Sequence, residues 1–123
     1  MQSTLNWFEI FVSDMDRAQA FYERILSIKL KPESFMGEPH AIFPSEGLAG
    51  ALVKRANRQP SADGVLIYLN CERRLDAVIE MTPQAGGRVL MPKTDIGEPG
   101  FIAIIGDTEG NVVGVHSSRS GAA

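Results

Sequence analysis

The chain contains few of the residues that most often build covalent cross-links and metal centres. Its 123 residues include one cysteine, Cys71, and two histidines. A single thiol excludes an intrachain disulfide, and it also excludes a zinc site built from several thiolates. We interpret Cys71 as a small buried apolar residue, which agrees with a protein kept in a reducing compartment.

Long hydrophobic runs and an excess of positive charge are also missing. No apolar run approaches the roughly 18 to 20 residues that span a bilayer, so we expect no membrane partner. A formal net charge of -3 argues against a nucleic-acid partner, because binding to phosphates needs a clustered basic surface. No basic leader precedes the N-terminal hydrophobic stretch, which carries Glu9. We therefore expect a cytoplasmic protein without a secretory signal.

The first half of the chain predicts a strand, a helix and three further strands. Aromatic and β-branched residues at 7–12 indicate a strand, which ends at Ser13 and Asp14, a pair suited to capping a helix. Apolar residues recur at three- and four-residue spacing over 16–26, as in an amphipathic helix. Short segments at 28–31, 40–43 and 50–54 lie between prolines and glycines, which is typical of a small sheet.

The second half predicts the same order of elements. A strand at 65–71 precedes a helix at 75–84, the pair Gly86 and Gly87 ends that helix, and strands follow at 88–91, 101–105 and 112–116. An offset of 59 residues lays Ala18 on Ala77 and Glu9 on Tyr68. We predict one α+β domain over 1–123, with βαβββ repeats at about 5–55 and 64–118 and a tail at 119–123. The mixed sheets are expected to curl around a central cavity.

Two stretches carry a resemblance to a known family. NWFEIFVSDMDRAQAFYERIL resembles the opening of the vicinal oxygen chelate superfamily, also called the glyoxalase/bleomycin resistance/dioxygenase group. AGGRVLMPK, followed by FIAIIGDTEGNVVGVHS, resembles its closing half. The resemblance spans roughly residues 5 to 118 and is nearest to glyoxalase-like members with a VGxHS ending.

The resemblance implies a divalent metal, such as iron, nickel, zinc or manganese, held by His and Glu side chains in the cavity. It places the first-strand ligand at Trp7 and the last-strand glutamate at Gly114, so both of these ligands are missing. Glu9 and His116 each stand two residues further along the same strands. Because side chains alternate with a period of two, they share the sheet faces of the lost positions.

We therefore predict a shifted metal site of Glu9 and His116, with His40 as the third ligand. Glu9 is also the candidate catalytic acid or base. Each residue has a structural alternative: an ion pair for Glu9, since a buried charge needs a partner, an exposed loop position for His40, and a solvated strand end for His116.

Two functions follow from these residues. The first is a glyoxalase-like enzyme, a lyase or dioxygenase by resemblance, that uses a divalent metal on a small oxygenated substrate. The second is a metal-free protein that binds a small aromatic or planar ligand, as bleomycin-resistance proteins do, in a pocket lined by Trp7, Phe11 and Tyr68. The resemblance also implies a homodimer.

Overall fold

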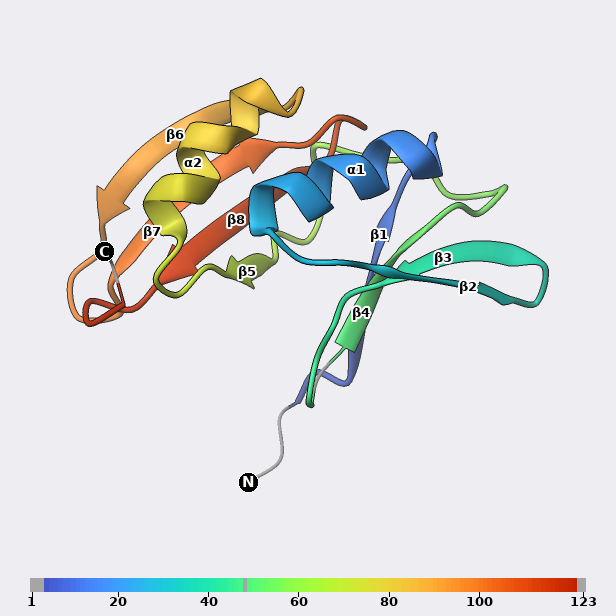
Figure 1. The fold of residues 1–123 in the computed structure, drawn as a ribbon, viewed down its shortest axis with the longest axis horizontal. Helices are drawn as coiled ribbons and strands as arrows, with labels where there is room; N and C mark the ends of the chain where they lie inside the picture. The colour runs from blue at the N-terminus through green and yellow to red at the C-terminus, as the bar shows by residue number, and fades with distance from the viewer. Residues whose placement is uncertain (1–3, 48, 122–123) are drawn as a thin grey trace.

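The computed structural model describes residues 4–47 and 49–121, and it shows two consecutive βαβββ units (Figure 1). The first unit consists of β1 (Trp7–Phe11), α1 (Met15–Leu26), β2 (Lys31–Phe35), β3 (Glu38–Ile42) and β4 (Ala49–Val53). The second consists of β5 (Tyr68–Asn70), α2 (Leu75–Gln84), β6 (Arg88–Asp95), β7 (Phe101–Gly106) and β8 (Val112–Ser117). The predicted α+β fold of tandem repeats is confirmed. Neither helix within the described residues has the length and apolar character needed to cross a membrane.

Each unit forms its own four-stranded mixed sheet with the same topology. The strand orders are β1-β4-β3-β2 and β5-β8-β7-β6. In both sheets the first and last strands of the unit pair in parallel, and the remaining neighbours pair antiparallel. The first strand of each unit, β1 or β5, therefore lies at the edge of its sheet. Curling of the two sheets around one shared cavity stays a prediction.

The offset between the repeats changes within the unit. Residues 59 apart match at the ends of β1 and β5, Phe11 and Asn70, as the sequence predicts. The first residues of β3 and β7, Glu38 and Phe101, are 63 apart instead. The change falls at β6, which has eight residues where β2 has five and carries two irregularities in its pairing with β7. Such bulges add residues to one strand without altering the order of strands.

The second strand also starts later than the sequence predicts. Residues 28–30 form a connector in which the Leu30 N–H donates to the Glu23 carboxylate, and β2 begins at Lys31 and contains Pro32. Proline is tolerated there because β2 is an edge strand, where one row of N–H groups has no neighbouring strand. The predicted strand at 65–71 is likewise shorter, since only 68–70 pair as β5.

One hydrophobic core joins the two units. The buried face of α1 presents Ala18, Phe21, Tyr22 and Ile25, at the spacing the sequence predicts for this helix. The two helices pack against each other, α1 also covers β3 and β4, and α2 covers β6, β7 and β8 (Figure 1). Burial of each large apolar side chain stabilises the fold by about 1.5–3 kcal/mol. Cys71 is buried within this core, which confirms its interpretation as a small buried apolar residue.

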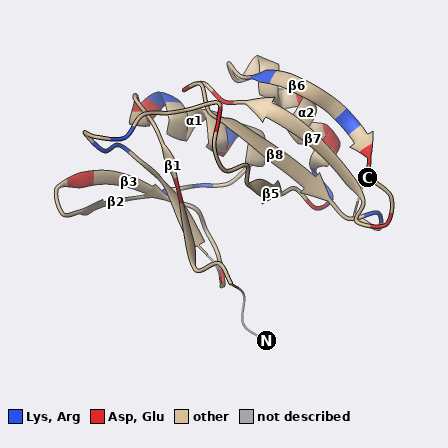
Figure 2. Cartoon of the chain, turned by 180° about the vertical axis from the view of Figure 1, so that it is seen from behind, with Lys and Arg blue, Asp and Glu red and all other residues tan. Residues whose placement is uncertain are grey.

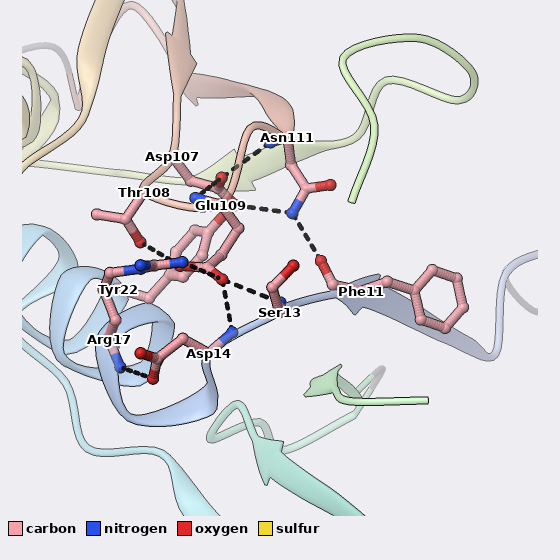
Figure 3. Close-up of polar contacts among 9 residues, drawn as sticks. All are labelled: Phe11, Ser13, Asp14, Arg17, Tyr22, Asp107, Thr108, Glu109 and Asn111. Atoms are coloured by element: carbon pink, nitrogen blue, oxygen red, sulfur yellow. Dashed lines mark hydrogen bonds and ion pairs between the residues drawn. The ribbon is translucent and has the colours of Figure 1, made fainter. Parts of the chain in front are cut away.

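The hairpin at 107–111 in the second unit forms hydrogen bonds with the start of α1 in the first unit (Figure 3). The fully buried Glu109 carboxylate accepts hydrogen bonds from the backbone N–H groups of Ser13 and Asp14, at 2.9 and 2.8 Å. The Arg17 guanidinium also donates to it, with a distance of 2.6 Å from Nε. Burial alone would raise the pKa of the Glu109 carboxyl, but these hydrogen bonds, the one from Arg17 foremost, lower it to about 2.

Two neighbouring side chains extend this contact into the core. The Tyr22 hydroxyl donates to Asp107 at 2.7 Å, and burial next to that carboxylate raises the pKa of Tyr22 well above its usual value. The Asn111 amide donates to the carbonyl of Phe11 at 2.8 Å, which ties the hairpin to the end of β1 (Figure 3). Strand, helix and hairpin are thus held by bonds between residues about one hundred positions apart.

Replacing Glu109 by Gln is expected to destabilise the protein by about 2–4 kcal/mol near pH 7, because it removes a buried, paired charge. The lowered pKa means that the native state gains from this carboxylate above its ordinary pKa of 4.5 and loses that gain as the pH falls toward about 2. Urea unfolding at several pH values should therefore show a difference between wild type and Glu109→Gln that shrinks with acidification. The exposed Glu98→Gln is the control, and a gap that does not depend on pH would contradict the assignment.

Gly87 allows the β6 strand to pass close to α1 and β7. A Cβ atom at this position would lie 2.5 Å from the Gly106 carbonyl oxygen and 2.6 Å from the Phe21 ring. Gly87→Ala is expected to cost about 1–3 kcal/mol in the free energy of unfolding through overpacking. Gly47→Ala, which would meet no atom within 4 Å, serves as the control. Equal stability of the two variants would show that the backbone gives way at no cost.

Candidate functional site

The face of β1 that points away from the core carries Trp7, Glu9 and Phe11. Phe8 and Ile10 alternate with them and pack into the core. The parallel pairing with β4 sets Glu9 beside Ala51, so small side chains flank the carboxylate on that strand. Seen from behind, β1 and β8 lie in front of the helices (Figure 2).

Arg55 neutralises Glu9. Its Nη1 lies 3.0 Å from Glu9 Oε1, and its Nε donates to both oxygens of Glu38 at 2.9 and 3.0 Å. The hydrogen bonds that Arg55 donates, first to Glu38 and then to Glu9, raise the pKa of Arg55 above its ordinary value, so this guanidinium stays charged. The second oxygen of Glu9 accepts from Trp7 Nε1 at 3.3 Å. The ion-pair alternative for Glu9 is therefore present in the structure.

Arg55 itself was not among the residues singled out from the sequence. The signal for it is the alternation along β4: Ala51 and Val53 share the face of Glu9, and a period of two carries that face on to Arg55.

His40 lies next to this ion-pair network and is buried, with 6% of its surface exposed. The exposed-loop alternative for His40 is therefore wrong, because β3 runs from Glu38 and carries the ring inward. Its Nδ1 lies 2.9 Å from the carbonyl oxygen of Glu38. A carbonyl only accepts, so Nδ1 carries the proton and Nε2 faces Glu9 Oε2 at 3.8 Å. The Phe35 ring packs edge to face against the His40 ring, with the two ring centroids 5.0 Å apart.

His116 lies in the other sheet. On β8 it shares a face with Gly114, opposite the buried Val113 and Val115, as the alternation predicts. Its Nε2 lies 2.7 Å from the carbonyl oxygen of Pro99, so Nε2 donates and Nδ1 keeps the lone pair. The structure thus brings Glu9 and His40 together, and it places His116 with the loop before β7.

Tyr68 covers the position where the resemblance expects a glutamate. It pairs directly with Gly114 across β5 and β8, and a Cβ atom built on Gly114 would overlap the Tyr68 ring. A glutamate at this position would require the ring to move. The equivalent pair in the first unit is Glu9 and Ala51, but the offset of 59 residues did not reveal it, because Gly114 stands 63 residues after Ala51.

The residues present do not fit a divalent ion in this arrangement. Among residues 4–47 and 49–121, no group of three or more His, Cys, Asp or Glu side chains lies close enough together to hold one. Arg55 and Trp7 engage the Glu9 oxygens, and Tyr68 fills the space beside Gly114. A cation already occupies the position next to Glu9, so a metal there would meet charge repulsion.

A groove of about 740 Å³ runs beside the free edge of β1. Its walls come from β1, from the connector after β4 and from the start of β8, and include Trp7, Glu9, Phe11, Arg58 and Val65. The guanidinium of Arg58 lies 5.6 Å from the centre of the Phe11 ring. Arg58 makes no ion pair within the described residues, in contrast to Arg55. Tyr68 is not part of this groove and lines another one, of about 560 Å³, between the two units.

Comparison with curated proteins finds relatives of greater length. The chain is 29% identical over 120 residues to "Putative glyoxylase CFP32" of Mycobacterium bovis, and equally to the protein of the same name from Mycobacterium tuberculosis. The match covers 93% of this chain and 45% of those proteins, so the chain spans less than half the length of these relatives.

Solved structures share the fold at low sequence identity. A glyoxalase/bleomycin resistance protein from Albidiferax ferrireducens T118 has a TM-score of 0.71 and 16% identity, with 94% of this chain and 98% of that chain covered. The fosfomycin resistance protein FosX from Listeria monocytogenes has a TM-score of 0.73 and 17% identity, with 96% and 93% covered. A FosX variant was crystallised with Mn(II) and 1S,2S-dihydroxypropylphosphonic acid.

The family comparison agrees with the topology. The profile of the Glyoxalase/Bleomycin resistance protein/Dioxygenase superfamily matches residues 4–115, which is nearly the whole chain. With the duplicated βαβββ order, this match shows that the chain belongs to the glyoxalase/bleomycin resistance protein/dioxygenase superfamily.

Proposed function

We propose that this protein binds a small, planar, oxygen-bearing molecule in the β1 groove without a metal ion. The observation that carries the proposal is the pairing of Glu9 with Arg55 beside a groove lined by Trp7 and Phe11. An internal guanidinium takes the place next to the carboxylate that a divalent ion would need. Aromatic surface in the groove is accessible to a ligand, since the Trp7 residue is 40% exposed.

Two kinds of contact would hold such a ligand. Aromatic rings prefer offset or edge-on contacts with other rings, each worth about 0.5–1.5 kcal/mol beyond the area they bury. A charge-assisted hydrogen bond to an anionic oxygen contributes about 1.5–3 kcal/mol. Arg58 is suited to that bond, because the carboxylates of Glu9 and Glu38 already neutralise Arg55. The ligand class is therefore a planar aromatic anion, such as an aryl carboxylate.

An enzymatic function is the second candidate, and the approach of His40 to Glu9 favours it. Nδ1 of His40 is fixed on the Glu38 carbonyl, and Nε2 faces the carboxylate at 3.8 Å. A histidine oriented on one side and facing a carboxylate on the other is a common acid–base arrangement. In this candidate Glu9 accepts a proton from a small oxygenated substrate, in lyase or dioxygenase-like chemistry as the resemblance implies. The homodimer and the cytoplasmic location stay predictions.

The only tryptophan gives a direct test of the binding function. We expect 2-naphthoate, a planar aromatic carboxylate, to change Trp7 fluorescence, and calorimetry to give the same affinity with and without EDTA. Arg58→Gln should weaken binding about tenfold or more, because it removes the charged donor. Arg73→Gln, with the same change in charge elsewhere, is the matched control. Binding that disappears with EDTA, or a stoichiometric metal in untagged protein, would contradict the proposal.

Removal of Arg55 should turn the ion-pair network into a cation site. In Arg55→Gln the carboxylates of Glu9 and Glu38 lose their shared guanidinium, with His40 beside them. Two carboxylates and an imidazole suit Mn²⁺ or Zn²⁺, although these three side chains are too far apart to hold an ion while Arg55 lies between them and must move closer in the variant. We expect Arg55→Gln to bind one such ion by calorimetry, and the double variant Glu9→Gln/Arg55→Gln to bind far more weakly. Equal binding of Mn²⁺ or Zn²⁺ by the wild-type protein would show that Arg55 does not exclude the metal.

A further inference from the structure

A second groove, of about 560 Å³, opens between the two units near the start of β1 and takes no part in the proposed function. Only Phe8 lines both grooves. The wall of the second groove is mainly apolar and is formed by Phe8, Leu26, Ile28, Phe43, Leu69 and Val78. The ring of Tyr68 also lines this groove, next to the aliphatic side chains. The volume lies within the 300–1,000 Å³ common for small-molecule sites.

Cys71 contributes to this wall without adding charge. Burial raises the pKa of its thiol to about 11, which a hydrogen bond from the backbone of His116 offsets only in part. The thiol is therefore protonated at neutral pH and acts as one more apolar group.

Asn70, Glu72 and Arg74 line this groove and are exposed, and of the two charged side chains only that of Glu72 has hydrogen-bond partners in the described residues. Glu72 accepts hydrogen bonds from the backbone N–H and the hydroxyl of Ser118, which lower the pKa of its carboxyl and hold it against the C-terminal segment. Asn70 accepts the Glu72 N–H through Oδ1, and this leaves its amide NH₂ as a donor. The Arg74 guanidinium makes no ion pair in the described part of the chain.

Arg74 does not use its side chain to cap the helix that follows it. Arg74 is the N-cap residue of α2 and gives that helix no side-chain hydrogen bond. By contrast, Asp14 caps α1 with its own side chain. The Arg74 guanidinium and the Asn70 amide NH₂ therefore remain as hydrogen-bond donors in the lining of the groove.

We infer that this groove binds a monocarboxylate with a flexible alkyl body, its chain along Leu26, Leu69 and Val78 and its carboxylate at Arg74. Charge complementarity selects this occupant: the donors Arg74 and Asn70 are exposed, whereas Leu69 and Val78 are buried, so the head group stays at the exposed end of the groove. Leu26, Ile28, Leu69 and Val78 are the aliphatic side chains that would contact the chain of this ligand. The inference rests on different residues and does not depend on the proposed function.

The test compares decanoate with decanol by calorimetry. We expect decanoate to bind and decanol to bind about tenfold or more weakly, because it lacks the charge that Arg74 pairs with. Arg74→Gln should lose a similar factor for decanoate, whereas Arg73→Gln, its neighbour outside the groove, should leave binding unchanged. Methyl NMR of Leu26, Leu69 and Val78 should report the shifts that locate the chain. Circular dichroism checks that each variant is folded.

Crossing the two probes separates the two sites. Arg58→Gln should weaken 2-naphthoate and not decanoate, and Arg74→Gln should do the reverse. If Arg73→Gln and Arg74→Gln lose the same factor in decanoate affinity, the loss comes from the change in net charge and not from the position of Arg74. That result would overturn the inference. Equal binding of decanol and decanoate, or methyl shifts confined to Val65 and Val112 of the β1 groove, would overturn it as well.

Discussion

The structure depends on one buried carboxylate that joins its two units. Glu109 stands on a hairpin of the second unit, yet its hydrogen bonds go to the first turn of α1 and to Arg17. Because the carboxylate is fully buried, its charge is stable only while these donors surround it. The contact therefore fixes where β1 ends and α1 begins relative to β7 and β8. That placement positions the edge of β1, and with it both grooves.

Duplication gives the fold two equivalent positions, and this chain uses them differently. In the first unit Glu9 faces Ala51 and binds Arg55. In the second unit the corresponding position is Tyr68, whose ring covers Gly114. One position thus carries a neutralised carboxylate, and the other an aromatic ring over a glycine. Of the two ligand places that the resemblance implies, one is Trp7 and the other is Gly114, which the ring of Tyr68 covers.

Local signals explain which parts of the fold were predictable. The spacing of Ala18, Phe21 and Ile25 predicts α1 because apolar periodicity is a property of neighbouring residues. The later start of β2 was missed because Pro32 normally interrupts strands, and only its place at a sheet edge makes it acceptable. The change of repeat offset was missed because bulges in β6 depend on its pairing with β7. At the site, the faces of Glu9 and His116 were predictable from alternation, but the partner of Glu9 was not.

By itself, the sequence determined the order of elements, the duplication, the family and the face on which each candidate side chain lies, since these follow from periodicity, turn residues and short motifs. Tertiary structure alone decided which of those side chains meet. It brought His40 and Arg55 to Glu9, set His116 against Pro99 in the other sheet, and laid Tyr68 over Gly114. The physical reason is that strand register and packing between distant segments select the partners of a charge, and no local pattern encodes that selection.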